Sequence, residues 1–287
     1  MIKLARVAVL VAIGTLTISG TVWAQAQSKD QQKCITKLNR DGLKTHETQA
    51  KINRKCVKDV GKGKVLPSAA EACLTSDPQG QVMKRQGKTN TAESSFCTGS
   101  GIPNYGYTSA ATVNTAAVQA EIDLMHDMFG NPVDNNLFAC DPNVNECLCQ
   151  RNMINRIEEV MQVIGRVFQA CKKSGLKATL GGITSPAGLQ GCFDDPGTAL
   201  SVVTDPGGQI ADTVGFMTGT LNQECEATTS TANSFSGGVC NGLTGSAAQD
   251  CIVRRVRCRA CLMINAFDGI TSDCDTFDNG TADASCP

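Results

Sequence analysis

The sequence is poor in histidine and in aromatic side chains, which limits both its chemistry and its core. Aromatic residues make up 4% of the 287 residues, and there are only two histidines and one tryptophan. No Gly-x-Ser-x-Gly stretch occurs, so a nucleophile elbow is not indicated. Gly61-Lys62-Gly63-Lys64 lacks the spacing of a phosphate loop. We therefore expect no catalytic residues and no cofactor, and the scarcity of catalytic side chains favours a protein that is not an enzyme.

Long apolar runs are also absent after the first residues. Lys3 and Arg6 precede an apolar stretch from Val7 to Ile18, and Ala24-Gln25-Ala26 offers a small-residue cleavage site. This pattern is typical of a secretory signal peptide, and the stretch is shorter than the roughly 20 residues of a membrane-spanning helix. We expect cleavage near residue 26, export to the periplasm or beyond the cell, and no membrane span in the mature chain.

Cysteine, by contrast, is abundant. The chain has 16 cysteines, and all of them follow the predicted signal peptide. An even number of cysteines in an exported protein predicts a disulfide framework. We expect eight disulfides, each stabilising the fold by roughly 2 to 4 kcal/mol when unstrained.

The cysteines recur at matching spacings, which indicates an internal duplication. Cys34 and Cys56 are 22 residues apart, as are Cys149 and Cys171. Two Asp-Pro stretches, beginning at Asp77 and Asp205, each end at a cysteine 20 residues later, at Cys97 and Cys225.

Apolar residues between Cys149 and Cys171 recur at helical spacing. Met153, Ile157, Val160, Ile164 and Val167 step by 4, 3, 4 and 3, which predicts a helix that packs lengthwise on a neighbour. Ile210 to Cys225 is helical by the same criterion, with Asp-Pro as its N-cap and first turn.

The equivalent positions of the first copy are more polar. They include Gly42, Thr45 and Gln49, so we expect the first unit to depend more on its disulfides. Each unit is interpreted as a helical hairpin.

A hairpin with cysteines near both ends predicts a specific pairing, although sequence alone leaves the connectivity open. The start of the first helix lies beside the end of the second. The predicted pairs are Cys34 with Cys97, Cys56 with Cys73, Cys149 with Cys225, and Cys171 with Cys192.

The remaining segments complete an all-α fold with irregular loops. Residues 98–117 are rich in Gly, Ser, Thr and Asn and are interpreted as a loop, followed by a short amphipathic helix from Val118 to Phe129. Residues 247–267 form a C-terminal helix before an acidic tail. The expected organisation is a signal peptide at 1–26, a first hairpin at 27–97, a loop and helix at 98–148, a second hairpin at 149–225, and a cysteine-rich C-terminal part at 226–287.

Charge is distributed unevenly along the chain. Residues 25–97 hold 14 Lys and Arg against 7 Asp and Glu, whereas residues 98–148 hold 6 acidic residues and no Lys or Arg. Basic residues recur along one side of the first helix, and Lys37, Lys44, Lys51 and Lys55 are the candidate binding face. An anionic surface polymer, or self-association, would suit it. Nucleic acid is disfavoured, because no aromatic residues lie between the lysines.

Metal binding, or a hydrolytic enzyme built on it, is the alternative function. Asp123, His126 and Asp127 share one turn of a helix, which could supply part of a metal site. The tail offers Asp273, Asp275 and Asp278 on a glycine-bearing loop, a calcium-like arrangement that departs from the EF-hand register.

Two further features are interpreted as structural. His46 lies in a polar stretch that we interpret as surface. Cys258-Arg-Ala-Cys261 is a C-x-x-C, but its position inside a helical pattern favours structural disulfides over redox catalysis.

Several motifs resemble those of uncharacterised cysteine-rich exported bacterial proteins. They are the Cys34-x21-Cys56-Val-Lys-Asp-Val-Gly-Lys-Gly-Lys stretch, Cys73-Leu-Thr-Ser-Asp-Pro-Gln-Gly, His126-Asp-Met-Phe-Gly and Cys274-Asp-Thr-Phe-Asp-Asn-Gly. The resemblance spans nearly the whole mature chain. It implies export from a bacterium and carries over no activity.

Overall fold

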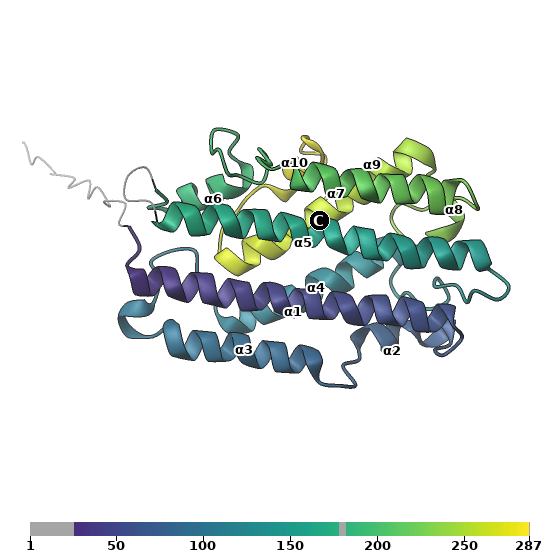
Figure 1. Cartoon of the computed structure of the whole chain (residues 1–287), viewed down its shortest axis with the longest axis horizontal. Coiled ribbons are helices and arrows are strands. Elements are labelled where there is room, and N and C mark those ends of the chain that lie inside the picture. The colour runs from purple at the N-terminus through teal and green to yellow at the C-terminus, as the bar shows by residue number, and fades with distance from the viewer. Residues whose placement is uncertain (1–25, 178–181, 287) are drawn as a thin grey trace, which may run out of the picture.

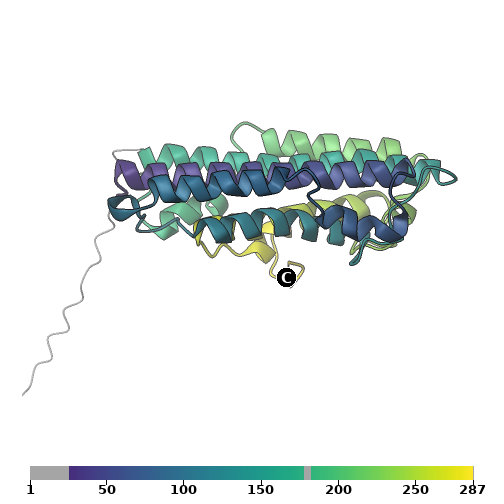
Figure 2. The ribbon, with the colours of Figure 1, turned by 90° about the horizontal axis from the view of Figure 1, so that it is seen from below.

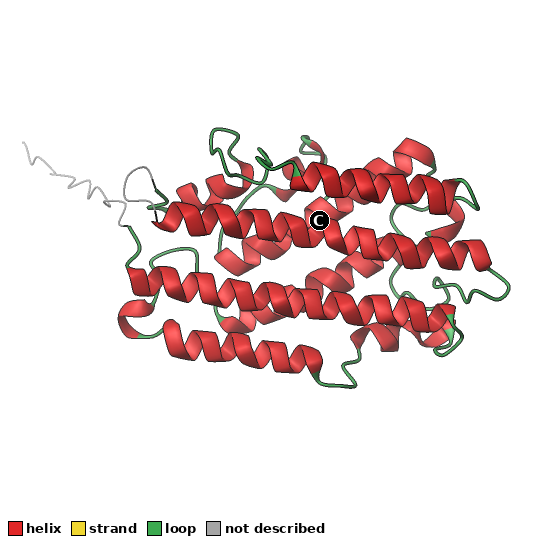
Figure 3. Ribbon diagram, in the orientation of Figure 1, coloured by secondary structure: helices red, strands yellow, loops and turns green. Residues whose placement is uncertain are grey.

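The computed structural model describes residues 26–177 and 182–286. The expected signal peptide lies outside these residues, apart from Ala26. The described residues form an all-α protein, as predicted; they contain ten α-helices and no strand (Figure 3). None of their helices combines the length and apolar character that a bilayer crossing needs.

The longer helices form two layers (Figures 1 and 2). One layer places four helices side by side, and a second layer of two helices covers one of its faces. The first layer contains, in order, α3 (Gln81–Phe96), α1 (Lys29–Gly61), α5 (Val144–Lys177) and α7 (Gln209–Thr220). The second contains α4 (Ala110–Phe129) and α9 (Gly245–Asp268).

Two long helices, α1 and α5, form the centre of the first layer. They have 33 and 34 residues, which is roughly 50 Å at 1.5 Å per residue. They run antiparallel, since Gly61 at the end of α1 lies against Cys147 near the start of α5. Helix α1 begins with a capping box, in which Ser28 and Gln31 each bond the other's backbone N–H.

Shorter helical segments connect these elements. They are η1 (Pro67–Ala69), α2 (Ala70–Thr75), η2 (Gly99–Gly101), α6 (Pro186–Asp194), the π-helical turn η3 (Leu221–Glu226), α8 (Thr231–Ser234) and α10 (Cys274–Asn279).

All 16 cysteines are paired in eight disulfides, and each disulfide has at least one cysteine in a helix. Within the hairpins the pairs are Cys34–Cys97, Cys56–Cys73, Cys149–Cys225 and Cys171–Cys192, the same pairs that the spacings predict. The other four are Cys140–Cys147, Cys240–Cys251, Cys258–Cys286 and Cys261–Cys274. So many disulfides are typical of a protein that matures in an oxidising, extracytoplasmic compartment.

The polar middle of α1 is buried, which the sequence did not suggest. Gly42 lies so close to α4 and α9 that a Cβ there would stand 2.3 Å from Val113 and 3.0 Å from Phe267. Thr45 and Gln49 are also buried, and Gln49 donates a hydrogen bond to the carbonyl of Leu74 at 3.0 Å. The first unit therefore packs tightly along the same side of its helix, through close approach and hydrogen bonds.

Two predicted boundaries are wrong. Helix α4 begins at Ala110, where Ser109 caps it, so the segment interpreted as a loop supplies its first two turns. Helix α7 begins at Gln209 with Gly208 at the N-cap, so Pro206 lies before the helix. The Asp205 carboxylate still accepts hydrogen bonds from the backbone N–H groups of Ile210 and Ala211 at 3.0 and 2.9 Å.

Candidate functional site

The exposed side of α1 carries a row of basic side chains, interrupted by Glu47 between Lys44 and Lys51. Helices α3, α4 and α5 cover its other sides, so this row faces solvent on the outer face of the first layer (Figures 1 and 2). The row runs at steps of three, four or seven residues through Lys29, Lys33, Lys37, Arg40, Lys44, Lys51, Lys55, Lys58 and Lys62.

Three hollows adjoin this row, and all three are basic. The N-terminal basic hollow, of about 720 Å³, lies between the start of α1 and the end of α5. The C-terminal basic hollow, of about 590 Å³, lies between the end of α1 and the start of α5. The lateral basic hollow, of about 330 Å³, lies between α1 and α3.

Their charged linings contain 15 basic residues and one acidic residue. The N-terminal hollow has Lys29, Lys33, Lys37, Lys173 and Lys177. The C-terminal hollow has Arg54, Lys55, Lys58, Asp59, Lys62, Lys64 and Arg151. The lateral hollow has Lys51, Lys84, Arg85 and Lys88.

Asp59 is the single acidic residue in these linings, and the basic residues around it lower the pKa of its carboxyl group. A hydrogen bond from Lys55 is the main cause that lowers the pKa of Asp59, and the charges of Lys55, Lys64 and Lys62 lower it further. At the other end, the ammonium group of Lys33 lies 4.4 Å from the centre of the Phe96 ring, a cation–π contact. The row is therefore rich in positive charge, although Asp41 lies near Arg40 and Lys44, and Asp59 pairs with Lys55.

The structure divides the predicted binding residues between the hollows. Lys37 lines the N-terminal basic hollow, Lys51 the lateral one, and Lys55 the C-terminal one. Lys44 lines none of the three and lies 3.8 Å from the Asp41 carboxylate.

A buried polar network lies directly beneath the row. His46 is fully buried, so its interpretation as a surface residue is wrong. Its Nε2 lies 2.7 Å from Oε1 of Glu121 on α4, a side chain that is also fully buried. Arg54 reaches inward from the C-terminal basic hollow, and its Nε lies 3.2 Å from Oε2 of the buried Glu158 on α5. The network therefore ties α1 to α4 and α5.

Glu158 is the most perturbed acid of this network. Burial raises its pKa well above the usual 4.5, repulsion from Glu121 raises it further, and Arg54 opposes both effects. A raised pKa means that the native state holds the proton more tightly than the unfolded chain does. The stability that this proton contributes is complete below about pH 4.5 and is lost as the pH rises through the native-state pKa.

We therefore expect Glu158→Gln to become more stable, relative to the wild type, as the pH rises. Glutamine removes the titrating group and keeps the side-chain shape, while Arg54, which is 28% exposed, can turn toward water. Guanidinium unfolding of both proteins at pH 5 and pH 8 measures the difference. A difference in free energy of unfolding that is the same at both pH values would contradict this prediction.

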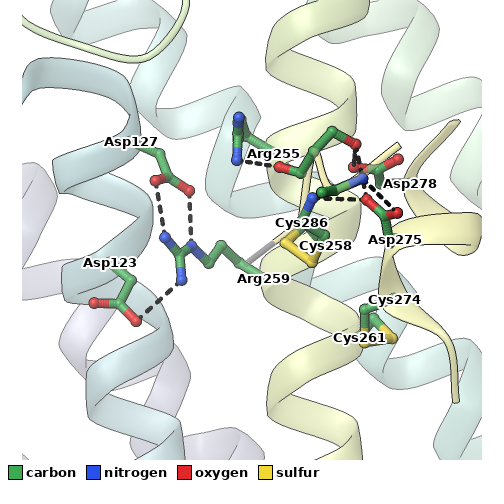
Figure 4. The surroundings of a disulfide bond; sticks show 12 residues. Asp123, Asp127, Arg255, Cys258, Arg259, Cys261, Cys274, Asp275, Asp278 and Cys286 are labelled. Atoms are coloured by element: carbon green, nitrogen blue, oxygen red, sulfur yellow. Dashed lines mark hydrogen bonds and ion pairs between the residues drawn. A yellow bond between two sulfur atoms is a disulfide. The ribbon is translucent and has the colours of Figure 1, made fainter. Parts of the chain in front are cut away.

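The Asp123–His126–Asp127 turn makes ion pairs rather than an open ligand set. Arg259 of α9 donates two hydrogen bonds to Asp127, at 2.7 and 2.8 Å, and one to Asp123 at 3.2 Å (Figure 4). His126 points elsewhere, with Nε2 3.1 Å from both carboxylate oxygens of Glu71. These contacts join α4 to α9 and to α2.

The tail aspartates accept hydrogen bonds from nearby backbone N–H groups and from one hydroxyl group. Asp273 caps α10 by accepting from the N–H groups of Asp275 and Thr276, both at 3.1 Å. Asp275 accepts from the N–H of Cys286 at 3.0 Å, and Asp278 accepts from the Ser285 hydroxyl at 2.7 Å (Figure 4). The described residues contain no group of three His, Cys, Asp or Glu side chains placed to hold a metal ion.

The C-x-x-C cysteines are each joined to the tail. Cys258 pairs with Cys286 and Cys261 with Cys274, so the motif itself contains no internal disulfide (Figure 4). Cys258 and Cys261 are both fully buried. Their role in this structure is to hold α10 and the tail against α9.

A second buried ion pair escaped sequence reasoning. Lys172 of α5 and Asp268 at the end of α9 are both buried, with Nζ 2.7 Å from Oδ1, and Asn39 of α1 donates to the same oxygen at 2.8 Å. Together with Glu158 and His46, these residues place several ionisable side chains in the interior of the molecule.

Comparisons of the chain with protein-family models, with curated proteins and with solved structures found no match.

Proposed function

We propose that this protein is exported to the periplasm or the cell exterior, where it binds an anionic polymer along the exposed side of α1 and has no enzymatic activity. One observation carries the proposal. The three basic hollows gather 15 basic residues against one acidic residue, although the whole chain has 26 Lys and Arg and 27 Asp and Glu. Such segregation of charge on a nearly neutral protein favours attraction of a polyanion.

The length of the basic row favours a polymer over a small anion. Its residues extend from Lys29 to Lys62, which is roughly 50 Å along the helix axis. Exposed charges that are separated by more than about 8 to 10 Å are largely screened from one another at physiological salt. A small anion would therefore interact with one hollow alone, whereas a chain with repeated negative groups can contact all three.

Self-association through the acidic segment, residues 98–148, is less well supported by the contacts. Asp123 and Asp127 already pair with Arg259, and Glu121 is buried. These residues of the acidic segment are therefore not available to a second copy.

We also propose that the two hairpins are copies of one unit. In both, an Asp-Pro-x-Gly stretch precedes the second helix, with Gly80 and Gly208 in the left-handed region at φ 61° and 65°. Asp77 accepts from the N–H groups of Gln81 and Met83, as Asp205 does from those of Ile210 and Ala211. The disulfides at both ends of each hairpin match as well.

The copies differ most on the proposed binding surface. The spacing of the two copies aligns Lys37 with Asn152, Lys44 with Glu159 and Lys55 with Ala170. In the second helix, Lys84 aligns with Asp212 and Lys88 with Phe216. The first copy supplies 12 of the 15 basic residues of the hollows, and the second copy supplies the other three, so the basic surface belongs mainly to the first copy.

Reversing one charge in each basic hollow tests the proposal. We expect the variant Lys37→Glu, Lys58→Glu, Lys88→Glu to bind dextran sulfate more than a hundredfold more weakly than the wild type. The estimate takes about 1 kcal/mol for each basic residue near an anionic surface and 1.4 kcal/mol for each tenfold change in affinity. Elution from a dextran sulfate column in a salt gradient, together with titration calorimetry, measures the change.

A matched control separates the effect of the basic surface on binding from the effect of net charge. The variant Arg156→Glu, Arg166→Glu, Arg254→Glu changes the net charge by the same amount, and none of these residues lines a basic hollow. We expect it to elute close to the wild type. Equal losses in both variants would show that retention depends on net charge alone, which would overturn the proposed binding surface.

A further inference from the structure

A hollow with mainly apolar walls lies in the first hairpin, between the second half of α1 and the segment that contains α2. Its volume is about 590 Å³, within the range of roughly 300 to 1,000 Å³ that small-molecule sites occupy. The Cys56–Cys73 disulfide lies in its wall. The apolar side chains that line it are Ile52, Val65, Ala69, Ala72 and Pro78.

Positive charge lies at the rim of this apolar hollow. Lys51 and Lys55, both exposed on α1, line it together with two acidic residues, Asp59 and Asp77. Lys51 also lines the lateral basic hollow, and Lys55 also lines the C-terminal basic hollow. The apolar hollow therefore lies between two basic ones and shares a lysine with each.

The acids at the rim are already engaged. Asp59 pairs with Lys55. Asp77 uses both carboxylate oxygens to accept from the N–H groups of Gln81 and Met83, at 2.7 and 3.0 Å. Lys51 takes part in none of the ion pairs found among the described residues. Its ammonium group is therefore available to an anionic ligand.

Apolar surface continues beyond the hollow. Leu66 is 68% exposed and directly follows the lining residue Val65. Met83 is 70% exposed and lies two residues after the lining residue Gln81. A ligand with an elongated apolar part would cover more of this surface than a compact one.

We propose that this hollow binds a single-chain anionic amphiphile, an alkyl phosphate or alkyl carboxylate. The alkyl chain occupies the apolar hollow, and the anionic head group contacts Lys51 and Lys55. Apolar walls select the chain, and the ammonium group of Lys51, which makes no ion pair among the described residues, favours an anionic head group. This site shares Lys51 and Lys55 with the polyanion surface, but its apolar hollow is separate, and the proposal does not depend on polyanion binding.

Calorimetric titration with decyl phosphate, below its micelle concentration and in 0.5 M NaCl, tests the site, with decanoate as the second probe. We expect saturable binding of one molecule per chain. We expect Ala72→Trp to lower the affinity at least tenfold, because the ring fills the hollow from an exposed position. Ala69→Trp repeats the test from another exposed lining residue, and both variants should keep their retention on dextran sulfate.

Charge variants test the head-group contact. We expect Lys51→Gln, Lys55→Gln to weaken decyl phosphate at least tenfold while leaving the weaker binding of decanol unchanged. The matched control Lys84→Gln, Lys88→Gln alters only the lateral basic hollow and should bind decyl phosphate like the wild type.

The proposal is overturned by any of three results. They are the absence of saturation with decyl phosphate, normal binding of it by both tryptophan variants, and binding of decanol as tight as that of decyl phosphate. Circular dichroism and a count of free thiols establish that each variant keeps its helices and disulfides. Loss of dextran sulfate binding in the Lys37, Lys58, Lys88 variant with intact decyl phosphate binding would show that the two sites act independently.

Discussion

Replacing Lys172 by methionine is expected to lower the free energy of unfolding by about 3 to 5 kcal/mol at neutral pH. The Lys172 ammonium lies 2.7 and 3.0 Å from the two carboxylate oxygens of Asp268. The two side chains are 1% and 0% exposed. Methionine keeps the apolar part of the side chain, so the main loss is the partner of a buried carboxylate. Denaturant unfolding of the wild type and the variant measures it.

The pKa shifts of Lys172 and Asp268 also indicate that each buried charge depends on the other. Burial raises the pKa of Asp268 despite the opposing effects of Lys172 and Asn39. Burial likewise lowers the pKa of Lys172 despite the attraction of Asp268. Desolvation therefore exceeds attraction at both groups, so each charge is tolerated only because the other is present.

A double variant separates charge from packing. Lys172→Met combined with Asp268→Asn removes both charges, and the new amide can still accept the hydrogen bond from Asn39. We expect it to recover most of the stability that Lys172→Met loses. A double variant as unstable as the single one would mean that volume or the contact of Lys172 with the Phe168 ring dominates.

The hairpins are the part of the fold that sequence spacing could predict. A helix places its ends at a distance set by residue count, so cysteines 22 residues apart on one helix must pair with another element. Two antiparallel helices then leave few combinations, and the pairing of Cys34, Cys56, Cys149 and Cys171 follows. This pairing depends only on residue spacings within each hairpin, so it can be predicted from the sequence.

The buried ionisable side chains were missed because only one row of α5 was followed. A second row, displaced by one residue, is also buried: Ile154, Glu158, Met161, Gly165, Phe168 and Lys172, at steps of 4, 3, 4, 3 and 4. Its two charged members lie at core spacing, which was the available signal. Helix α5 needs two buried rows because α1, α7 and α9 all pack against it.

His46 was placed at the surface for a related reason. Its neighbours along the chain are polar, and a polar stretch of helix ordinarily faces water. Only the position of Glu121 on α4, which comes from a distant part of the sequence, gives the imidazole a partner inside the protein. The lysine row of α1 was visible in the sequence, but the contributions of Lys84, Arg151 and Lys173 to its hollows depend on how the helices pack.

Removing the Cys149–Cys225 disulfide is expected to cost about 4 kcal/mol, because a cross-link that closes a longer loop restricts the unfolded chain more. The two cysteines are 76 residues apart in sequence and are both fully buried. The variant Cys149→Ala, Cys225→Ala should also melt roughly 10 °C below the wild type. Denaturant unfolding and calorimetry under oxidising conditions measure both quantities.

The Cys140–Cys147 disulfide provides the matched control, since it closes a loop of only 7 residues. Its removal by Cys140→Ala, Cys147→Ala is expected to cost about 2 kcal/mol by the same argument. The longer link also joins the start of α5 to η3 at the end of the second hairpin, whereas the shorter one closes a local turn beside α5. Equal losses would mean that loop entropy does not set the contribution of these disulfides. A larger loss for Cys149–Cys225 would show that the hairpin link is a principal constraint on the unfolded chain.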